Sequence, residues 1–210
     1  MMAFLGAVAS AFCVIWSAAA VPYDEGCDFT GLDLDRAVDK LLSKLPEYHI
    51  PYEHEYHRAF AGVETGPLNL TGLNKVRRYG PLLPYCINDT RMLQLELFSE
   101  RETFLSLPWR ACTGHEGALL IKADVSRFTI LLRVENQGLG ENLKLAYEGP
   151  ILPLSTENTK FEITGFGRRL IEKTNVLSTL FPAITQHAWN DYFFINFRGA
   201  LRKALSEAFE

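Results

Sequence analysis

Three histidines lie close to Glu53 and Glu55 in the tyrosine-rich stretch 47–60, EYHIPYEHEYHRAF. His54 and His57 are three residues apart, and with one carboxylate they could ligate Zn²⁺. The metalloprotease pattern, which places two histidines and a glutamate on one helix, is missing. We therefore interpret His49, His54 and His57 as part of a polar loop packed on tyrosines, and we predict neither a metal nor another cofactor.

Other residues that could do chemistry are isolated along the chain. The segment 165–170, GFGRRL, lacks the third glycine and the βαβ context of a dinucleotide-binding loop, so we interpret it as a bend between a strand and a helix. No G-x-S-x-G nucleophile motif is present. The pairs Arg77–Arg78 and Arg168–Arg169 could meet an anionic head group, although isolated pairs are usually solvated. We predict that the protein is not an enzyme, with an unfamiliar hydrolase as the open alternative.

The stretch 189–197, WNDYFFINF, has five aromatic residues among nine. On a helix these rings would leave only a narrow polar strip, at Asp191, Arg198 and Arg202, so the helix must be covered on most sides. It could lie inside a curled sheet, pack between a sheet and another helix, or form one wall of a cavity that an apolar ligand fills. A β-strand over YFFINF is the alternative, but the helical pattern of 198–209 argues against it.

The elements that must position this segment follow from hydrophobic periodicity. Apolar residues at helical spacing predict a helix over 31–45, with Asp33 at its start and Pro46 after its end. A second, long helix is predicted from Pro182 to about Phe209. Between the helices, alternating apolar residues predict antiparallel strands. These strands cover residues 66–73, 92–98, 128–134, 143–147 and 160–164, and the fold class is α+β.

The first twenty residues carry no charge and end in three alanines. We interpret residues 1–20 as a secretory signal peptide cleaved after Ala20, with a membrane anchor as the alternative. Residues 21–210 would then form a single secreted domain without a transmembrane segment. The formal net charge of −4 and the lack of a basic cluster argue against a nucleic-acid partner.

Secretion would leave Cys27, Cys86 and Cys112 in an oxidising environment, where one pair should form a disulfide. Three pairings are possible. We favour Cys86–Cys112, because both residues fall near predicted strand ends, which leaves Cys27 as a free thiol. Asn69 and Asn88 begin two N-glycosylation triplets, so we predict a glycoprotein.

Three segments resemble the group 7 mite allergens. They are 38–46 (VDKLLSKLP), 66–80 (GPLNLTGLNKVRRYG) and 163–209, from ITGFGRRL to RKALSEAF. Those secreted proteins are similar to one half of the bactericidal/permeability-increasing protein and to insect juvenile-hormone-binding and takeout proteins. The resemblance implies a long curved antiparallel sheet wrapped around the C-terminal helix, with the N-terminal helix alongside. It also implies an apolar tunnel or groove between sheet and helix, and no catalytic residues.

These observations predict a non-enzymatic carrier of a hydrophobic small molecule, such as a fatty acid, another lipid or a terpenoid, held by burial of its apolar surface. The expected ligand contacts lie on the C-terminal helix and on facing strands: Trp189, Phe193, Phe197, Leu180, Phe181, Ile184, Leu95, Leu97, Ile130 and Leu132. The alternative is a secreted module that binds an extracellular protein and has a filled core. Its contact patch would lie around Trp109, in the long loop expected over 97–117.

Overall fold

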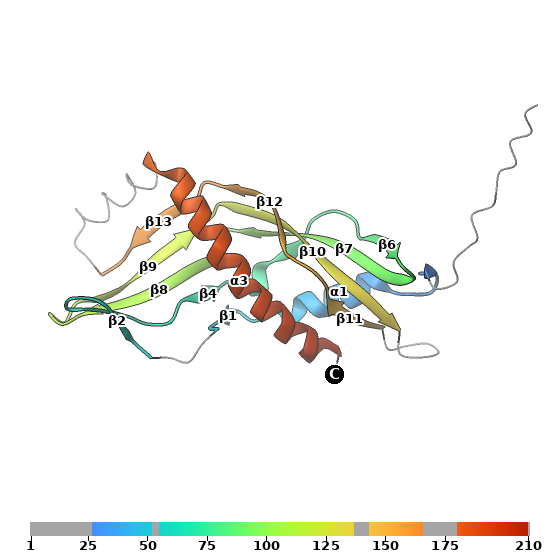
Figure 1. Cartoon of the computed structure of the whole chain (residues 1–210), viewed down its shortest axis with the longest axis horizontal. Coiled ribbons are helices and arrows are strands. Elements are labelled where there is room, and N and C mark those ends of the chain that lie inside the picture. Colours follow the sequence, from blue (N-terminus) through green and yellow to red (C-terminus); the bar gives the residue numbers. More distant parts are fainter. Residues whose placement is uncertain (1–26, 52–54, 137–142, 166–179, 210) are drawn as a thin grey trace, which may run out of the picture.

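The computed structural model describes residues 27–51, 55–136, 143–165 and 180–209, and all structural statements concern those residues. Within them the chain forms a helix, then strands, then a long helix, which confirms the predicted α+β class (Figure 1). The predicted signal peptide, His54 and the Arg168–Arg169 pair lie outside the described residues. No helix in the described part is long and apolar enough to cross a membrane.

Helix α1 spans Leu34–Ser43, inside the range that the sequence predicts. Asp33 caps its start, because the Asp33 carboxylate accepts a hydrogen bond from the Arg36 N–H at 3.0 Å. The apolar positions Leu34, Val38 and Leu41 are buried, so the predicted apolar face of this helix packs on the core.

The strands form two antiparallel sheets rather than the single long sheet that was predicted. In the first sheet, β8 is central: it pairs with β9 along one edge and with β4 and β3 along the other. The strands of this sheet are β1 (Tyr48–His49), β2 (His57–Phe60), β3 (Val63–Thr65), β4 (Asn69–Thr71), β8 (Phe104–Ala111), β9 (Glu116–Lys122) and β13 (Lys160–Ile163).

In the second sheet β10 is central, with β7 on one side and β11 and β12 on the other. Its strands are β5 (Arg77–Arg78), β6 (Leu83–Ile87), β7 (Thr90–Glu100), β10 (Val125–Asn136), β11 (Leu143–Tyr147) and β12 (Leu152–Glu157). Alternate residues of β7 and β10 are fully buried, and the register places Leu95 opposite Ile130 and Leu97 opposite Phe128. This alternation gives one apolar face to each strand, as the sequence predicts.

The stretch 97–117 was expected as a long loop, but most of it is strand: the end of β7, the whole of β8 and the start of β9. That prediction is wrong. Pro108 is tolerated within the strand because it lies at the gap between the residues of β8 that pair with β3 and those that pair with β4. Its carbonyl accepts a hydrogen bond from the Gly66 N–H at 2.9 Å, so the missing N–H of the proline faces this gap and not β9.

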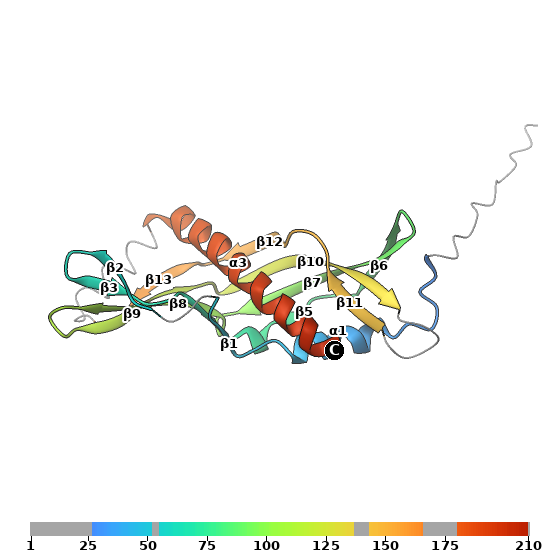
Figure 2. The same cartoon turned by 60° about the horizontal axis from the view of Figure 1, so that its bottom comes forward.

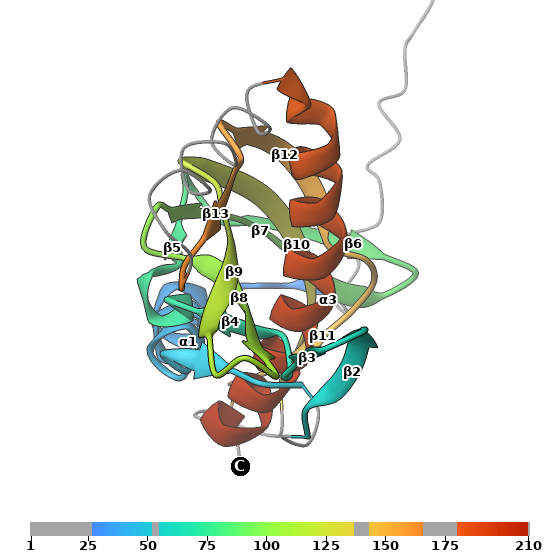
Figure 3. The ribbon, with the colours of Figure 1, turned by 90° about the vertical axis from the view of Figure 1, so that its left-hand side faces the viewer.

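Helix α3 spans Pro182–Phe209, as predicted, and the strand alternative for this segment is wrong. The helix runs diagonally across both sheets (Figure 1), and its C-terminal end lies beside α1 (Figure 2). Viewed end-on, the sheets curve around one side of α3, while the other side of its N-terminal half faces outward (Figure 3). The helix is therefore sheathed on one side and open on the other.

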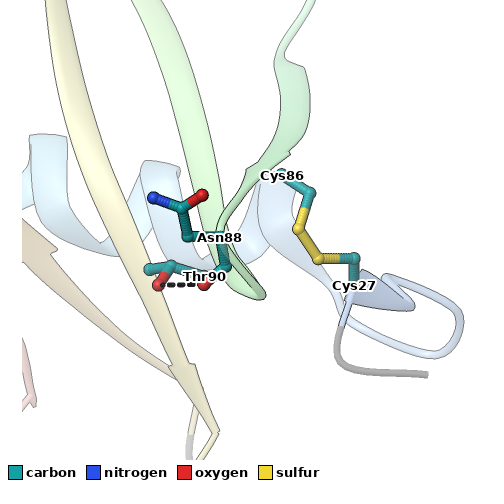
Figure 4. Close-up of a disulfide and its surroundings, with 4 residues drawn as sticks. All are labelled: Cys27, Cys86, Asn88 and Thr90. Carbon is teal, nitrogen blue, oxygen red and sulfur yellow. Dashed lines mark hydrogen bonds between the residues drawn. A yellow bond between two sulfur atoms is a disulfide. The ribbon is translucent and has the colours of Figure 1, made fainter. Parts of the chain in front are cut away.

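The disulfide joins Cys27 to Cys86, so the predicted Cys86–Cys112 pairing is wrong (Figure 4). Strand β6 brings Cys86 to the segment that precedes α1, with a Cα–Cα distance of 5.9 Å to Cys27. Cys112 is a free, exposed thiol in the turn after β8, at the opposite end of the molecule from β6 (Figure 1). Sequence position near a strand end could not reveal that separation.

The two glycosylation triplets differ in their surroundings. Asn88 is exposed in the tight turn between β6 and β7, where its backbone φ is 47° (Figure 4). Asn69 is half-buried within β4, and its side-chain oxygen accepts a hydrogen bond from the Thr71 hydroxyl at 3.3 Å. Glycosylation of both residues stays a prediction.

Candidate functional site

The aromatic residues of α3 form a column in the centre of the molecule. The Trp189 and Phe193 rings stack at 4.7 Å between centroids, and the Phe193 and Phe197 rings at 5.7 Å. Phe128 of β10 meets Phe193 and Phe197 edge-on, at 5.5 and 4.9 Å. The Trp189 indole N–H donates to the Ser126 hydroxyl at 3.2 Å, so the one polar atom of the column is satisfied.

This central column is filled protein core. Seven of the predicted ligand contacts meet there and have no surface accessible to water: Trp189, Phe193, Phe197, Leu95, Leu97, Ile130 and Leu132. A void large enough for a water molecule would give the residues around it accessible surface, so no such void adjoins these side chains. Their contact with a ligand stays a prediction, and it would require the core to open.

The other three predicted contacts lie at the N-terminal end of α3 and are exposed to solvent. Leu180 is 65% exposed, Phe181 50% and Ile184 60%. Phe181 and Ile184 border a pocket of about 200 Å³, which Phe161 of β13 and Thr185 of α3 also line among the described residues. The structure therefore divides the predicted residues into a closed core and an open apolar pocket.

Among the described residues that line the pocket, none offers a free polar group. The Thr185 hydroxyl lies 2.8 Å from the Pro182 carbonyl and 2.7 Å from the Thr159 hydroxyl, and Thr185 is buried. A polar ligand group that entered the pocket would lose its hydrogen bonds to water without replacement. The described lining of the pocket therefore suits a hydrocarbon group.

Sequence reasoning missed Phe161 and Thr185 as pocket residues. Phe161 belongs to the alternating stretch 160–164, so its strand was predicted, but nothing in the sequence indicates which helix that strand faces. Trp109, the proposed centre of a protein-binding patch, is only 7% exposed, so the structure does not place a patch around its ring.

A second pocket, of about 390 Å³, lies at the tip formed by the β2–β3 and β8–β9 turns, and it contains Cys112. Arg110 in its wall is bound to Glu64 at 2.7 Å and lies over the Tyr56 ring at 4.2 Å. The Arg110 charge is thus already matched by a carboxylate, and we rank this tip below the apolar pocket as a candidate site.

Of the histidines considered for a metal site, His49 lies on β1 and His57 on β2. Burial, and then the positive charge of Lys203, lower the pKa of His49, so its neutral form is favoured. Within the described residues no three His, Cys, Asp or Glu side chains are placed to hold a metal ion.

The candidate site is thus an apolar pocket at one end of α3. No protein-family model matches the chain, and no similar sequence is found among curated proteins.

Proposed function

We propose that the protein is a secreted, non-enzymatic binder of a hydrophobic small molecule, such as a fatty acid or a terpenoid. The site we propose is the pocket between β13 and the first turns of α3. The observation that carries the proposal is this opening, which is lined by Phe161, Phe181 and Ile184 and in which the Thr185 hydroxyl is already bonded. The resemblance to tubular lipid-binding proteins supports the same region, between sheet and helix.

The volume indicates how a ligand would lie. About 200 Å³ is below the roughly 300–1,000 Å³ of pockets that enclose a drug-sized molecule, so only part of a long ligand fits inside. Burial of about six methylene groups would contribute about 5 kcal/mol. Micromolar affinity requires about 8 kcal/mol, so the part of the ligand outside the pocket must also cover apolar surface of the protein. The exposed parts of Leu180, Phe181 and Ile184 provide that surface next to the opening.

The geometry also sets the orientation of an acyl chain. A carboxylate would be desolvated inside the pocket without a partner, whereas the methyl end carries no polar group. The methyl end therefore enters, and the head group remains in solvent. Selectivity should then depend on the length of the apolar chain more than on the head group.

The second candidate function is binding of an extracellular protein. The filled core favours it, because the central residues leave no open tunnel. Exposed apolar side chains on α3 would then be the contact surface, since large exposed apolar patches usually mark interaction sites.

Displacement of a fluorescent fatty acid, combined with native mass spectrometry of the secreted protein, tests the proposal. Phe161→Glu places a charge in the pocket wall and should weaken binding at least about tenfold, because a charge opposes apolar burial. Leu154→Glu is the matched control: Leu154 is 53% exposed on β12 and does not line the pocket, so binding should not change. Circular dichroism establishes that both variants fold.

Absence of any bound or displaced fatty acid in the wild-type protein would refute the carrier function. Equal weakening by Phe161→Glu and Leu154→Glu would show that the ligand binds elsewhere. Pull-down of a defined extracellular protein without lipid binding would favour the second candidate.

A further inference from the structure

Helix α3 carries a second apolar face, whose large side chains are exposed to solvent. Four residues of α3, Ile184, Ala188, Tyr192 and Ile195, continue the spacing that begins at Phe181, directly before the helix. The five follow one another at intervals of three, four, four and three residues, and we name them the outer stripe. At 100° per residue the four stripe residues of α3 fall within about 80° of one another, opposite the buried column. The four large side chains are 50–60% exposed, whereas Ala188 is half-buried and also packs against the core.

The spacing of the outer stripe is symmetric about Ala188. Phe181 and Ile195 lie seven residues on either side of it, and Ile184 and Tyr192 lie four residues on either side. An antiparallel copy of the same helix, related by a two-fold axis at Ala188, would therefore place Phe181 against Ile195 of the second copy. It would also place Ile184 against Tyr192 of the second copy, and the two Ala188 side chains against each other.

We propose that the protein forms a homodimer through this stripe, with two α3 helices packed antiparallel about Ala188. A two-fold interface must be self-complementary, so that if residue i meets residue j, then j meets i. The outer stripe meets this requirement at every position. The small side chain of Ala188 at the axis lets two helices approach to the usual separation of about 8–10 Å.

The buried area is sufficient for such a dimer. Large apolar side chains carry roughly 150–250 Å² each, so four that are about half exposed present roughly 400 Å² per copy. With Ala188 and the polar residues beside the stripe, two copies would bury about 1,000 Å², which is the lower limit for a specific interface. In the structure α3 lies in front of both sheets, so a second helix can approach its outer face (Figure 1).

Polar side chains at the edge of the stripe are compatible with the same axis. His187 and Asp191 lie on one edge and contact each other at 3.3 Å. Because they are four residues apart and centred within one residue of Ala188, the two-fold axis brings Asp191 close to His187 of the second copy. The two Asp191 carboxylates lie six residues apart along the axis, about 9 Å, so they do not meet directly.

Sedimentation equilibrium of the full chain tests the dimer. The wild-type protein should sediment with twice the mass of the chain at high concentration. Ile195→Asp should lower the association constant about 100-fold or more, because each substitution removes two buried side chains from a two-fold interface. Leu83→Asp is the matched control, since Leu83 is 51% exposed on β6, remote from α3, and should leave association unchanged. A monomer at all concentrations, or equal effects of the two variants, would overturn the proposal.

Disulfide cross-linking tests the antiparallel arrangement. In a Cys112→Ser background, Ala188→Cys should form a covalent dimer on mild oxidation, whereas Ile195→Cys should not. Fourteen residues, or about 21 Å along the helix, separate the two Ile195 positions in the antiparallel pair. A mixture of Phe181→Cys and Ile195→Cys chains should cross-link. Cross-linking of Ile195→Cys alone, or no cross-link in Ala188→Cys, would overturn the arrangement.

Phe181 and Ile184 line the apolar pocket and also belong to the outer stripe, so a dimer would cover one side of the pocket. The two proposals are tested separately at residues that belong to only one of them: Phe161 lines the pocket outside the stripe, and Ile195 lies in the stripe outside the pocket. If added fatty-acid vesicles bound the outer stripe in place of a second copy, the protein would co-sediment with them as a monomer, and the dimer would be refuted.

Discussion

Replacement of Phe193 by alanine examines whether the aromatic column is closed core. The Phe193 ring has no accessible surface and contacts Trp189, Phe197, Phe128 and Phe194 at centroid distances of 4.7–5.7 Å. Deletion of a buried phenylalanine costs about 3–5 kcal/mol, and lost ring contacts place this site in the upper half of that range. For a domain of this size the melting temperature should fall by about 10–15 °C.

The assay is urea unfolding followed by circular dichroism, with Phe60→Ala as the matched control. Phe60 is 65% exposed on β2, so the same atoms are deleted at a surface position, and the cost should stay below about 1 kcal/mol. Phe193→Ala should also leave an apolar cavity that benzene can fill and partly restabilise. A loss below about 1 kcal/mol, or no difference from Phe60→Ala, would show that the ring borders open space and would refute the filled core.

Three further predictions concern stability. Loss of the Cys27–Cys86 disulfide in a Cys27→Ser, Cys86→Ser double variant should lower the free energy of unfolding by about 4 kcal/mol, because the disulfide closes a loop that spans 59 positions. Cys112→Ser should leave it unchanged in the same urea titration, because Cys112 forms no disulfide. Gly72→Ala should lower the free energy of unfolding by about 3 kcal/mol, because φ is +83° and the new Cβ would lie 2.1 Å from the Glu102 carbonyl oxygen. Gly80→Ala is the control, because φ is +75° but the space around it is open, and it should cost only about 1–2 kcal/mol. Thermal melting measures both variants. Because the pKa of His49 is lowered in the folded state, the unfolded chain binds the proton more tightly. The contribution of His49 to the free energy of unfolding should therefore be fully present above pH about 6.5 and should fall as the pH drops below that value. His49→Gln should flatten that loss, and an unchanged pH profile would contradict it.

The periodic elements could be predicted because each depends on local sequence. Helix α1 needs only an apolar repeat and a cap at Asp33, and α3 begins at Pro182, as a proline in the first turn indicates. The strands β7, β10, β11 and β13 likewise follow from alternation of apolar residues. Burial of most of the aromatic segment follows from its apolar circumference.

Features that depend on chain segments far apart could not be predicted in the same way. The split into two sheets, the pairing of Cys27 with Cys86 and the position of Phe161 opposite Phe181 all depend on how the strands are placed in space. Strand β8 was missed because Pro108 and nearby charges suggest a loop, and only its place beside Gly66 explains why the proline fits. Periodicity also marks α3 residues as apolar without separating those that pack in the core from those that form the outer stripe.

The most direct test is a crystal structure of the protein with a fatty acid that carries bromine at its methyl end. The anomalous signal of the bromine locates that end of the chain without assumptions about the density. The bromine should lie between Phe161 and Thr185, in the apolar pocket at the start of α3. A bromine beside Phe193 and Ile130, within an opened core, would contradict the proposed site.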